Sequence, residues 1–274
     1  MTGSLQSKAY LNFRYDAERS QTWLSERKLG GLCHLSKPYW DGNVLVAQMI
    51  NPTAGFFSGD DFVIQIDVEQ GASVALTSPS ATRFYDTEDI PVKLTQKFQV
   101  RENGYLEVMP DWSIPQAGSE VSQKTELILD KGASCVLLER FMPGRIAHGE
   151  AYTYKSFTAT TSIQYAGELQ VHERMQLKGE NGPWPLAVNS WEVCYYSAFW
   201  IVLDDVDHIF SHVSHIEKLF SEDKIHCGVS QLSKQVIAIR IITDKSIKMK
   251  KSIERVRSHL SDVLPQLKST DRLF

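Results

Sequence analysis

Two glutamates stand where the alternation of a β-strand otherwise places apolar side chains. Leu169, Val171, Glu173, Met175 and Leu177 share one side of a strand, and Glu173 is the one charged residue among them. The other side of the same strand is entirely polar or charged. Because successive strand residues point to opposite faces, the pattern predicts that Glu173 faces inward.

Glu139 repeats this pattern on an earlier strand. It shares a strand face with four apolar residues: Ala133, Cys135, Leu137 and Phe141. An unpaired buried carboxylate costs on the order of several kcal/mol, so each glutamate needs a cation, a set of donors or water. Two interpretations stay open. One is a structural ion pair, for instance with Arg83, Arg140 or Arg145. The other is a carboxylate that lines an internal polar passage, where oxygen ligands suit divalent cations.

Three histidines form a ligand-like stripe on a predicted helix. At 100° per residue, His208, His212 and His215 fall within about 60° of one another. One helix can place two imidazoles on a metal, but a fourth ligand must then come from another element. The stripe borders the apolar face of the helix, so a solvated flank is the alternative interpretation.

A loop of small residues, Asn51 to Asp61 (NPTAGFFSGDD), leads into a predicted strand. Small residues let the backbone turn tightly and approach neighbouring segments. The loop is not a GxGxxG motif and opens no helix, so a phosphate-binding loop is not predicted. The pattern by itself predicts a turn.

The elements that must position these residues are mostly strands. Residues 62–68 and 92–100 alternate with period two, and glycine turns separate the strands. The segments GASVAL (71–76) and GASCVL (132–137) resemble each other. This similarity indicates layered sheets in which one strand–turn–strand unit occurs more than once. We expect a mainly β fold.

Two helices are predicted near the C-terminus. Apolar residues recur at helical spacing from Val206 to Phe220, with Asp204 or Asp205 as the cap. A second helix has an apolar side from Met249 to Val263. Basic residues are predicted to cover much of its remaining surface: Lys248, Lys250, Lys251, Arg255 and Arg257. We expect one domain over 1–274, with a subdomain boundary near 179–185 (GENGPWP).

Composition excludes several classes of function. The 274-residue chain has a net charge of -4 and a pI of about 6.1, so no basic field attracts nucleic acid or an anionic membrane. The four cysteines form no CxxC pair, and we expect reduced thiols that are mostly buried. No signal peptide and no apolar run of about 18 residues occurs, so a cytoplasmic protein is expected.

Five segments, in order, resemble the urease accessory protein family UreD, also called UreH. They are 51–61, 62–85, LEVMPDWSIPQAG (106–118), ERFMPGRIAHGE (139–150) and the last 45 residues. The resemblance covers nearly the whole chain. Thr53, Ala54 and Ser58 depart from the motif of the first segment, which leaves its conformation open. Glu139 stands where the family usually has aspartate.

The resemblance implies stacked, helically wound β-layers with two α-helices near the C-terminus. It implies a UreF-type accessory protein, a UreG-type GTPase and apo-urease as partners, and nickel as a transient cargo, with no tightly bound cofactor. It also implies an internal metal passage, with Asp60, Glu139 and Glu173 as candidates for its lining. Motif positions expected to hold the fold or the passage wall are Asn51, Gly55, Gly59, Arg83, Tyr85, Arg145 and Glu150.

The interpretation that results is a non-catalytic scaffold that helps deliver nickel to urease. Two alternatives stay open. In one, Glu139 and Glu173 form the acid and base of a β-rich hydrolase. In the other, the three helix histidines make a stand-alone nickel-binding protein.

Overall fold

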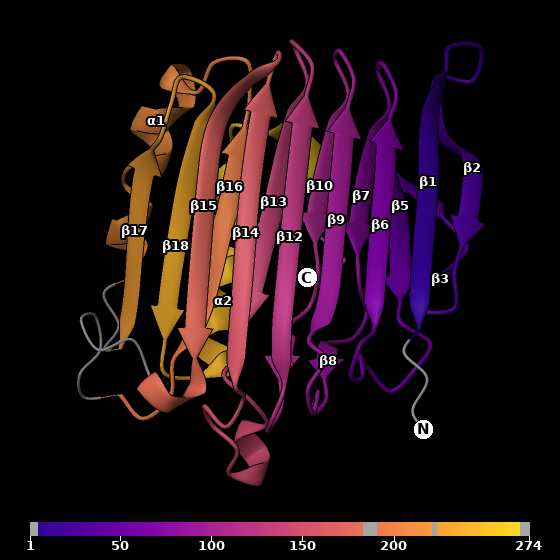
Figure 1. The fold of residues 1–274 in the computed structure, drawn as a ribbon. Coiled ribbons are helices and arrows are strands. Elements are labelled where there is room, and N and C mark those ends of the chain that lie inside the picture. The colour runs from indigo at the N-terminus through magenta and orange to yellow at the C-terminus, as the bar shows by residue number, and fades with distance from the viewer. Residues whose placement is uncertain (1–4, 183–190, 221–223, 269–274) are drawn as a thin grey trace.

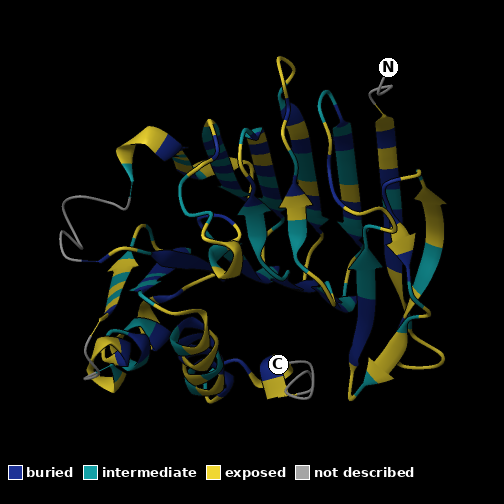
Figure 2. Cartoon of the chain, turned by 90° about the horizontal axis from the view of Figure 1, so that it is seen from below, coloured by how far each residue is buried: buried dark blue, intermediate teal, exposed yellow. Residues whose placement is uncertain are grey.

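The strands of this protein form two facing sheets, with helices on the outer face of one of them (Figures 1 and 2). A computed structural model describes residues 5–182, 191–220 and 224–268. Residues 183–185 of the expected subdomain boundary lie outside these ranges. No helix in the described ranges has the length and apolarity of a transmembrane span.

The first sheet, called sheet 1, has seven strands in the order β15-β14-β12-β9-β6-β1-β2 within the described residues. Strands β1, β6, β9, β12 and β14 are parallel, and the edge strands β15 and β2 run antiparallel to their neighbours. Its strands are β1 (Gln6–Asp16), β2 (Gln21–Leu29), β6 (Asp61–Val68), β9 (Val92–Val100), β12 (Glu120–Leu129), β14 (Ser156–Tyr165) and β15 (Glu168–Lys178).

The second sheet, sheet 2, has eleven strands within the described residues, with β17-β18-β16-β13-β10-β7-β5-β3 as its main path and β4, β8 and β11 beside it. Its strands are β3 (His34–Leu35), β4 (Tyr39–Asp41), β5 (Val44–Ile50), β7 (Ser73–Thr77), β8 (Thr82–Phe84), β10 (Tyr105–Met109), β11 (Ser113–Pro115), β13 (Ser134–Phe141), β16 (Tyr195–Val202), β17 (Ile225–Gln231) and β18 (Val236–Thr243).

The chain winds helically between the two sheets. It passes from β6 to β7, β9, β10, β12, β13 and β14, and these strands belong alternately to sheet 1 and sheet 2. Within each sheet, every strand of this series pairs in parallel with the strand that the previous coil added. Ser73, Tyr105 and Ser134 stand in one row across β7, β10 and β13. The two similar segments found in the sequence therefore occupy equivalent turns. The predicted mainly β, helically wound fold is confirmed.

Two α-helices lie near the C-terminus of the described chain, α1 (Asp207–Val213) and α2 (Ser246–Ser261), with the short 3-10 helices η1 (Ile146–His148), η2 (Gly179–Asn181) and η3 (Ile216–Leu219). The first predicted helix is interrupted after Val213. In a continuous helix the carbonyl of Ser211 would accept the backbone amide of His215. Instead it accepts the Ser214 hydroxyl at 3.1 Å and His215 Nδ1 at 2.9 Å, which stops the helix.

Two apolar layers hold these elements together. The larger lies between the sheets and contains the inward residues of β6, β9, β12 and β13. The other lies between the outer face of sheet 2 and the helices, where Met249, Ile253, Val256 and Leu260 of α2 are buried as their spacing predicts. Sheet 2 is therefore covered on both faces, as expected for a sheet with few polar positions.

An ion pair inside the outer layer corrects one prediction. Arg257, expected on the solvated side of α2, is 2% exposed and its Nε lies 3.0 Å from Oε1 of the fully buried Glu107 on β10. Arg257 also donates to the carbonyl of Leu267 at 2.7 Å. Helical periodicity missed this residue because its buried partner is 150 residues away in the chain.

We predict that Arg257→Met lowers the free energy of unfolding by about 3–5 kcal/mol, because it leaves the Glu107 charge buried without its cation. Denaturation in guanidinium chloride measures the change. Lys251→Met, at an exposed position of the same helix, is the control and should change stability by less than about 0.5 kcal/mol. The double variant Glu107→Met/Arg257→Met should recover most of the loss. A small effect of Arg257→Met would contradict the assignment.

Candidate functional site

The carboxylates of Glu139 and Glu173 line one cavity between the two sheets. Glu139 projects from β13 of sheet 2 and Glu173 from β15 of sheet 1. The cavity has a volume of about 60 Å³. Its wall is mixed, with Thr161 and Gln123 beside apolar side chains. The inward orientation that strand alternation predicts for both glutamates is therefore confirmed.

Strand alternation holds over most of β15 and fails at its start. Val171 and Leu177 are buried and Met175 packs against the inner core, as predicted. Leu169, predicted to face inward with them, is 60% exposed. A register shift between Ile163 and Gln164 of the paired strand β14 separates Leu169 from the regular ladder.

Glu173 forms an ion pair that joins the two sheets. Its Oε2 accepts a hydrogen bond from the guanidinium of Arg240 on β18. The side chains are 35% and 33% exposed, so this pair sits at an opening of the interior and not in its depth. Arg240 also lies over the Trp200 ring, 5.2 Å from its centroid.

In the described chain, none of the three arginines proposed from the sequence forms an ion pair with Glu139 or Glu173, although Arg140 lines the same cavity. Arg140 lies 3.6 Å from Asp111, and Arg145 pairs with Glu150. Arg83 is exposed, and its backbone carbonyl accepts the amide of Phe56. The ion-pair interpretation is correct for Glu173 in kind, but the cation is Arg240.

Glu139 is held by neutral donors. Trp200 Nε1 donates to Oε2 at 2.9 Å, and the hydroxyl of Thr161, from the opposite sheet, donates to Oε1 at 3.0 Å. Burial raises the pKa of Glu139, and these two hydrogen bonds partly offset that rise. The negative charge of Glu173 adds to the rise in the pKa of Glu139, and the positive charge of Arg240 opposes it. Glu139 is thus a carboxylate whose charge is only partly compensated.

Strand register explains why these groups meet. Glu139, Ala198 and Arg240 stand in one row across β13, β16 and β18 of sheet 2. In sheet 1, Thr161 is paired with Glu173 across β14 and β15. Ala198, fully buried, leaves room between the two longer polar side chains of its row.

The row in sheet 1 continues as a line of polar side chains, here called the polar row: Gln96, Thr125, Thr161 and Glu173. The four residues are paired in register across β9, β12, β14 and β15. Gln96 Nε2 donates to the Thr125 hydroxyl at 3.3 Å. Thr125 and Thr161 are 1% and 3% exposed, so the row lies inside the apolar layer.

A second cavity, of about 110 Å³, adjoins the first, and Gln96 and Thr82 line both. The cavity of the glutamates has two buried polar atoms without a hydrogen-bond partner among the described residues, Gln123 Oε1 and Arg140 Nε, and the adjoining cavity has one, Asn51 Nδ2. Such atoms favour water or a polar cargo. Sequence reasoning missed the polar row because Gln and Thr on an inner strand face carry no charge to mark them.

The structure separates Asp60 from the two glutamates. Its carboxylate accepts the backbone amides of Leu5 at 2.9 Å and Phe57 at 2.8 Å, and the residue is 4% exposed. It is absent from the described linings of both cavities. Its contacts stabilise the loop that begins β6, so its place among the passage residues is not supported by the geometry.

The other motif positions hold two loops against each other. A side chain on Gly55 would lie 2.5 Å from the carbonyl of Arg83, so only glycine permits this approach. The Tyr85 ring stacks on Phe57 at 4.8 Å. Gly59 has a left-handed φ of 77°. Thr53 departs from the family motif, and its hydroxyl closes the turn. It forms hydrogen bonds with Asn51 Oδ1 at 2.8 Å and with the Gly55 carbonyl at 2.7 Å.

Arg145 and Glu150 form a local, two-point ion pair next to these loops. Arg145 Nε donates to Glu150 Oε2 at 2.8 Å, and its terminal nitrogen donates to the other oxygen. The pair raises the pKa of Arg145 and lowers that of Glu150. The hairpin-like segment between them includes η1, so the pair holds a surface loop closed.

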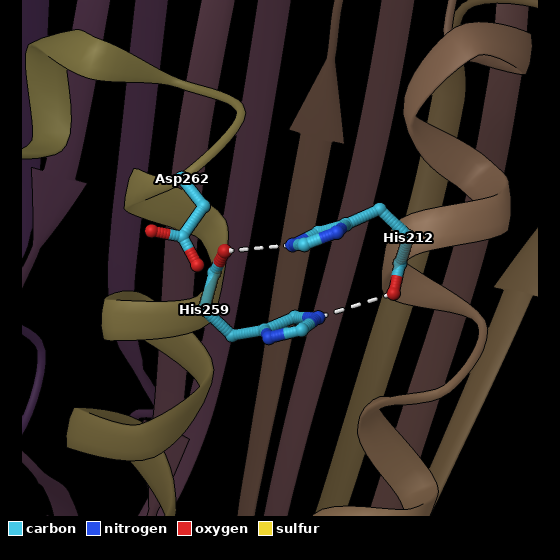
Figure 3. A group of neighbouring side chains, drawn as sticks. All are labelled: His212, His259 and Asp262. Carbon is cyan, nitrogen blue, oxygen red and sulfur yellow. Dashed lines mark hydrogen bonds between the residues drawn. The ribbon is translucent and has the colours of Figure 1, made fainter.

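The helix histidines do not assemble as one stripe. His208 is exposed, and His215 lies beyond the end of α1 with its Nδ1 bonded to the Ser211 carbonyl. His212 turns toward α2 instead, where it stacks on His259 (Figure 3). The predicted metal site built on His208, His212 and His215 is therefore wrong as a group, because the helix ends too early.

This fold and site define a class of protein: a helically wound β-scaffold with carboxylates turned into the space between its two sheets. Comparison with known proteins identifies the family. The model of the family described as UreD urease accessory protein matches residues 7–272.

Relatives from distant bacteria agree with this match. A urease accessory protein UreD of Opitutus terrae is 32% identical over 243 residues, which cover 87% of this chain and 88% of the relative. A protein of the same name from Actinomyces naeslundii is 31% identical, over 65% of this chain and 66% of the relative. Another from Staphylococcus epidermidis is 23% identical, over 79% of this chain and 78% of the relative. The chain belongs to the UreD urease accessory protein family, and its role is accessory to urease maturation.

Glu139 generates a pH-dependent prediction. Because its pKa is raised in the folded protein, the stability linked to this group is fully present below the unfolded value and is lost as the pH rises through the folded value. We expect Glu139→Gln to gain stability relative to the natural protein between about pH 4 and pH 8. Urea denaturation at both pH values measures this gain. Glu168→Gln, at an exposed position of β15, should show no such trend. A gain that is independent of pH would contradict the assignment.

Proposed function

We propose that this protein assists nickel delivery to urease by conducting the ion through the space between its two sheets. The observation that carries the proposal is the facing pair of Glu139 and Glu173 at one end of the polar row. Family membership supplies the accessory role. The geometry adds a line of oxygen-bearing groups across four strands whose other inward side chains are mainly apolar.

The chemistry of the lining suits an ion that has to leave again. Carboxylate, hydroxyl and amide oxygens bind nickel weakly compared with imidazole or thiolate. No histidine occurs among the described residues that line the two cavities. Cys33 lines the adjoining cavity, but burial raises its pKa to about 11, so it is a neutral thiol at physiological pH and a poor ligand. A passage of this kind holds no group that would trap the ion.

The Glu173–Arg240 ion pair stands at the opening of this route. A divalent cation that approaches Glu173 competes with the guanidinium of Arg240 for the same carboxylate. Arg240 has an alternative partner in the face of the Trp200 ring, 5.2 Å away. We infer that Arg240 releases Glu173 to the metal while it stays over Trp200, which makes the pair a gate for the cation.

The partners in this proposal are a UreF-type accessory protein, a UreG-type GTPase and apo-urease. The protein would bind the first directly, and the assembly would dock on apo-urease in the cytoplasm. The four free cysteines fit a reducing compartment. Co-expression with a UreF-type partner tests the assembly: a co-eluting complex that restores urease activity supports it, and absence of the complex contradicts it.

The cavity size weighs against the hydrolase alternative. Small-molecule sites measure about 300–1,000 Å³. The cavity between Glu139 and Glu173 measures about 60 Å³, which is enough for an ion and a few water molecules but too small for a sugar ring. Two hydrogen-bond donors, Trp200 and Thr161, also occupy the two oxygens of Glu139.

We predict that Glu173→Gln lowers the activation of urease several-fold while the complex with the partners still forms, because it removes a ligand charge and keeps the side-chain shape. Urease activity and the nickel content of purified urease measure the effect. Glu168→Gln, on the solvated part of the same strand, is the matched control. Failure of the Glu173 variant to assemble would assign it a structural role, and full activation would exclude it from the passage.

The polar row gives a second test of the passage. The double variant Thr125→Val/Thr161→Val replaces two hydroxyls by methyl groups of the same shape, so we expect a folded protein and a several-fold lower nickel content in urease. Thr160→Val, one position away on the outer face of β14, is the control. Unchanged nickel loading by the double variant would show that the ion does not follow this row.

A further inference from the structure

The hydrogen-bond ladder of sheet 2 is interrupted beside Glu139. Strand β13 pairs with β10 up to Leu137, and it pairs with β11 again only at Phe141. Between these points lie Glu139 and Arg140, which no strand of the described chain pairs with on that side. Opposite them, the chain passes from β10 to β11 through residues 110–112. Sheet 2 therefore has a gap here, where no backbone ladder separates its two faces.

Two spaces meet at this gap. On the inner side is the cavity of the glutamates. On the outer side is a hollow of about 400 Å³, here called the outer hollow, whose lining includes Lys250 and Glu254 of α2. The helices cover this outer face of sheet 2 (Figure 2). Three residues line both spaces: Pro110, Asp111 and Arg140. They form the wall between the inner cavity and the outer hollow.

Arg140 is held loosely in this wall. It follows Glu139 on β13, so strand alternation turns it toward the outer hollow, which it lines. Its Nη1 lies 3.6 Å from Asp111 Oδ1, which is too long for a well-formed hydrogen bond. Its buried Nε has no hydrogen-bond partner among the described residues. The guanidinium thus closes the gap with one distant partner, and it loses few contacts when it moves.

A route that conducts an ion needs two ends, and the Glu173–Arg240 pair accounts for one of them. We propose that Arg140 and Asp111, here called the outer gate, close a second opening of the passage, which leads through the gap in sheet 2 into the outer hollow. This inference rests on the proposed function and names the second end of its route.

The charges of the outer gate suit control of a cation. With Arg140 in the gap, its positive charge repels a divalent ion at short range, where the protein interior screens charge weakly. When the guanidinium swings into the outer hollow, Glu254 offers it a second carboxylate there. Asp111 is then left in the wall to face the ion with an uncompensated negative charge. The side chain of Arg140 can make this movement without a change in the backbone of β13.

A cysteine placed in the cavity of the glutamates tests the outer gate. Gln123 lines this cavity, is 8% exposed, and has an Oε1 without a partner among the described residues, so we choose Gln123→Cys. Mass spectrometry of the full-length protein measures how fast methyl methanethiosulfonate, a small neutral reagent, modifies this thiol. Asp111→Asn releases Arg140 and should raise the rate about fivefold. Arg140→Gln has a shorter side chain and should raise it at least about tenfold.

The chain offers a matched control and an internal monitor. Asp130 pairs with Arg101 at the same 3.6 Å on the surface, and neither is among the described residues that line the three spaces. Asp130→Asn should leave the probe rate within about twofold. Cys135, 0% exposed, should keep its own rate in every variant. Unchanged probe rates in both gate variants would overturn the proposal. A parallel rise at Cys135 would also overturn it, because the fold would then be loosened as a whole.

Blocking the second opening separates the outer gate from the passage itself. Asp111→Cys, at a side chain that is 31% exposed beside the outer hollow, is labelled with a bulky maleimide before the protein is assembled with its partners. We expect nickel loading of urease to fall several-fold relative to the unlabelled variant, and labelled Asp130→Cys to load normally.

The outcome of Glu173→Gln tells the two failures apart. If Glu173→Gln lowers nickel loading and the labelled Asp111→Cys protein does not, the second opening is overturned and the passage stands. If neither lowers loading, the passage itself fails, and the role of the outer gate fails with it. The modification rates of Gln123→Cys do not depend on nickel, so they show in either case whether the gap in sheet 2 opens.

Discussion

The parallel hydrogen-bond ladders between successive coils are the constraint on which the rest of this structure depends. Each coil adds one strand to sheet 1 and one to sheet 2, and the pairing fixes which residues stand side by side across the coils. A slip of one position would turn every inward side chain outward. The parallel pairing that lines up valines and phenylalanines in the core also lines up Gln96, Thr125 and Thr161, and the antiparallel pairing of β14 with β15 adds Glu173 to this row. A polar row inside an apolar layer is therefore a direct product of register.

Two arrangements of charged groups in this protein differ in how fully their charge is compensated, and their surroundings suit different tasks. Glu107 and Arg257 are paired at 3.0 Å with almost no exposure, and they join α2 to the outer face of sheet 2. Glu139 receives only neutral hydrogen bonds, and Glu173 shares its arginine with solvent and with the Trp200 ring. The first arrangement stabilises a fixed contact. The second leaves negative charge only partly compensated, which is the condition for a cation to bind and leave.

The sequence by itself determined the strand class, the inward orientation of Glu139 and Glu173, and the family, because period-two alternation and ordered motifs are local properties of the chain. It did not determine that Arg240 is the partner of Glu173, that Arg257 is buried against Glu107, or that Asp60 is occupied by backbone amides. Nor did it bring His212 to His259, or Thr125 and Gln96 into the polar row. Each of these depends on which strands become neighbours and in what register, and on where a helix stops. Those relations join residues tens of positions apart, so no local pattern records them, and only the packed tertiary structure decides them.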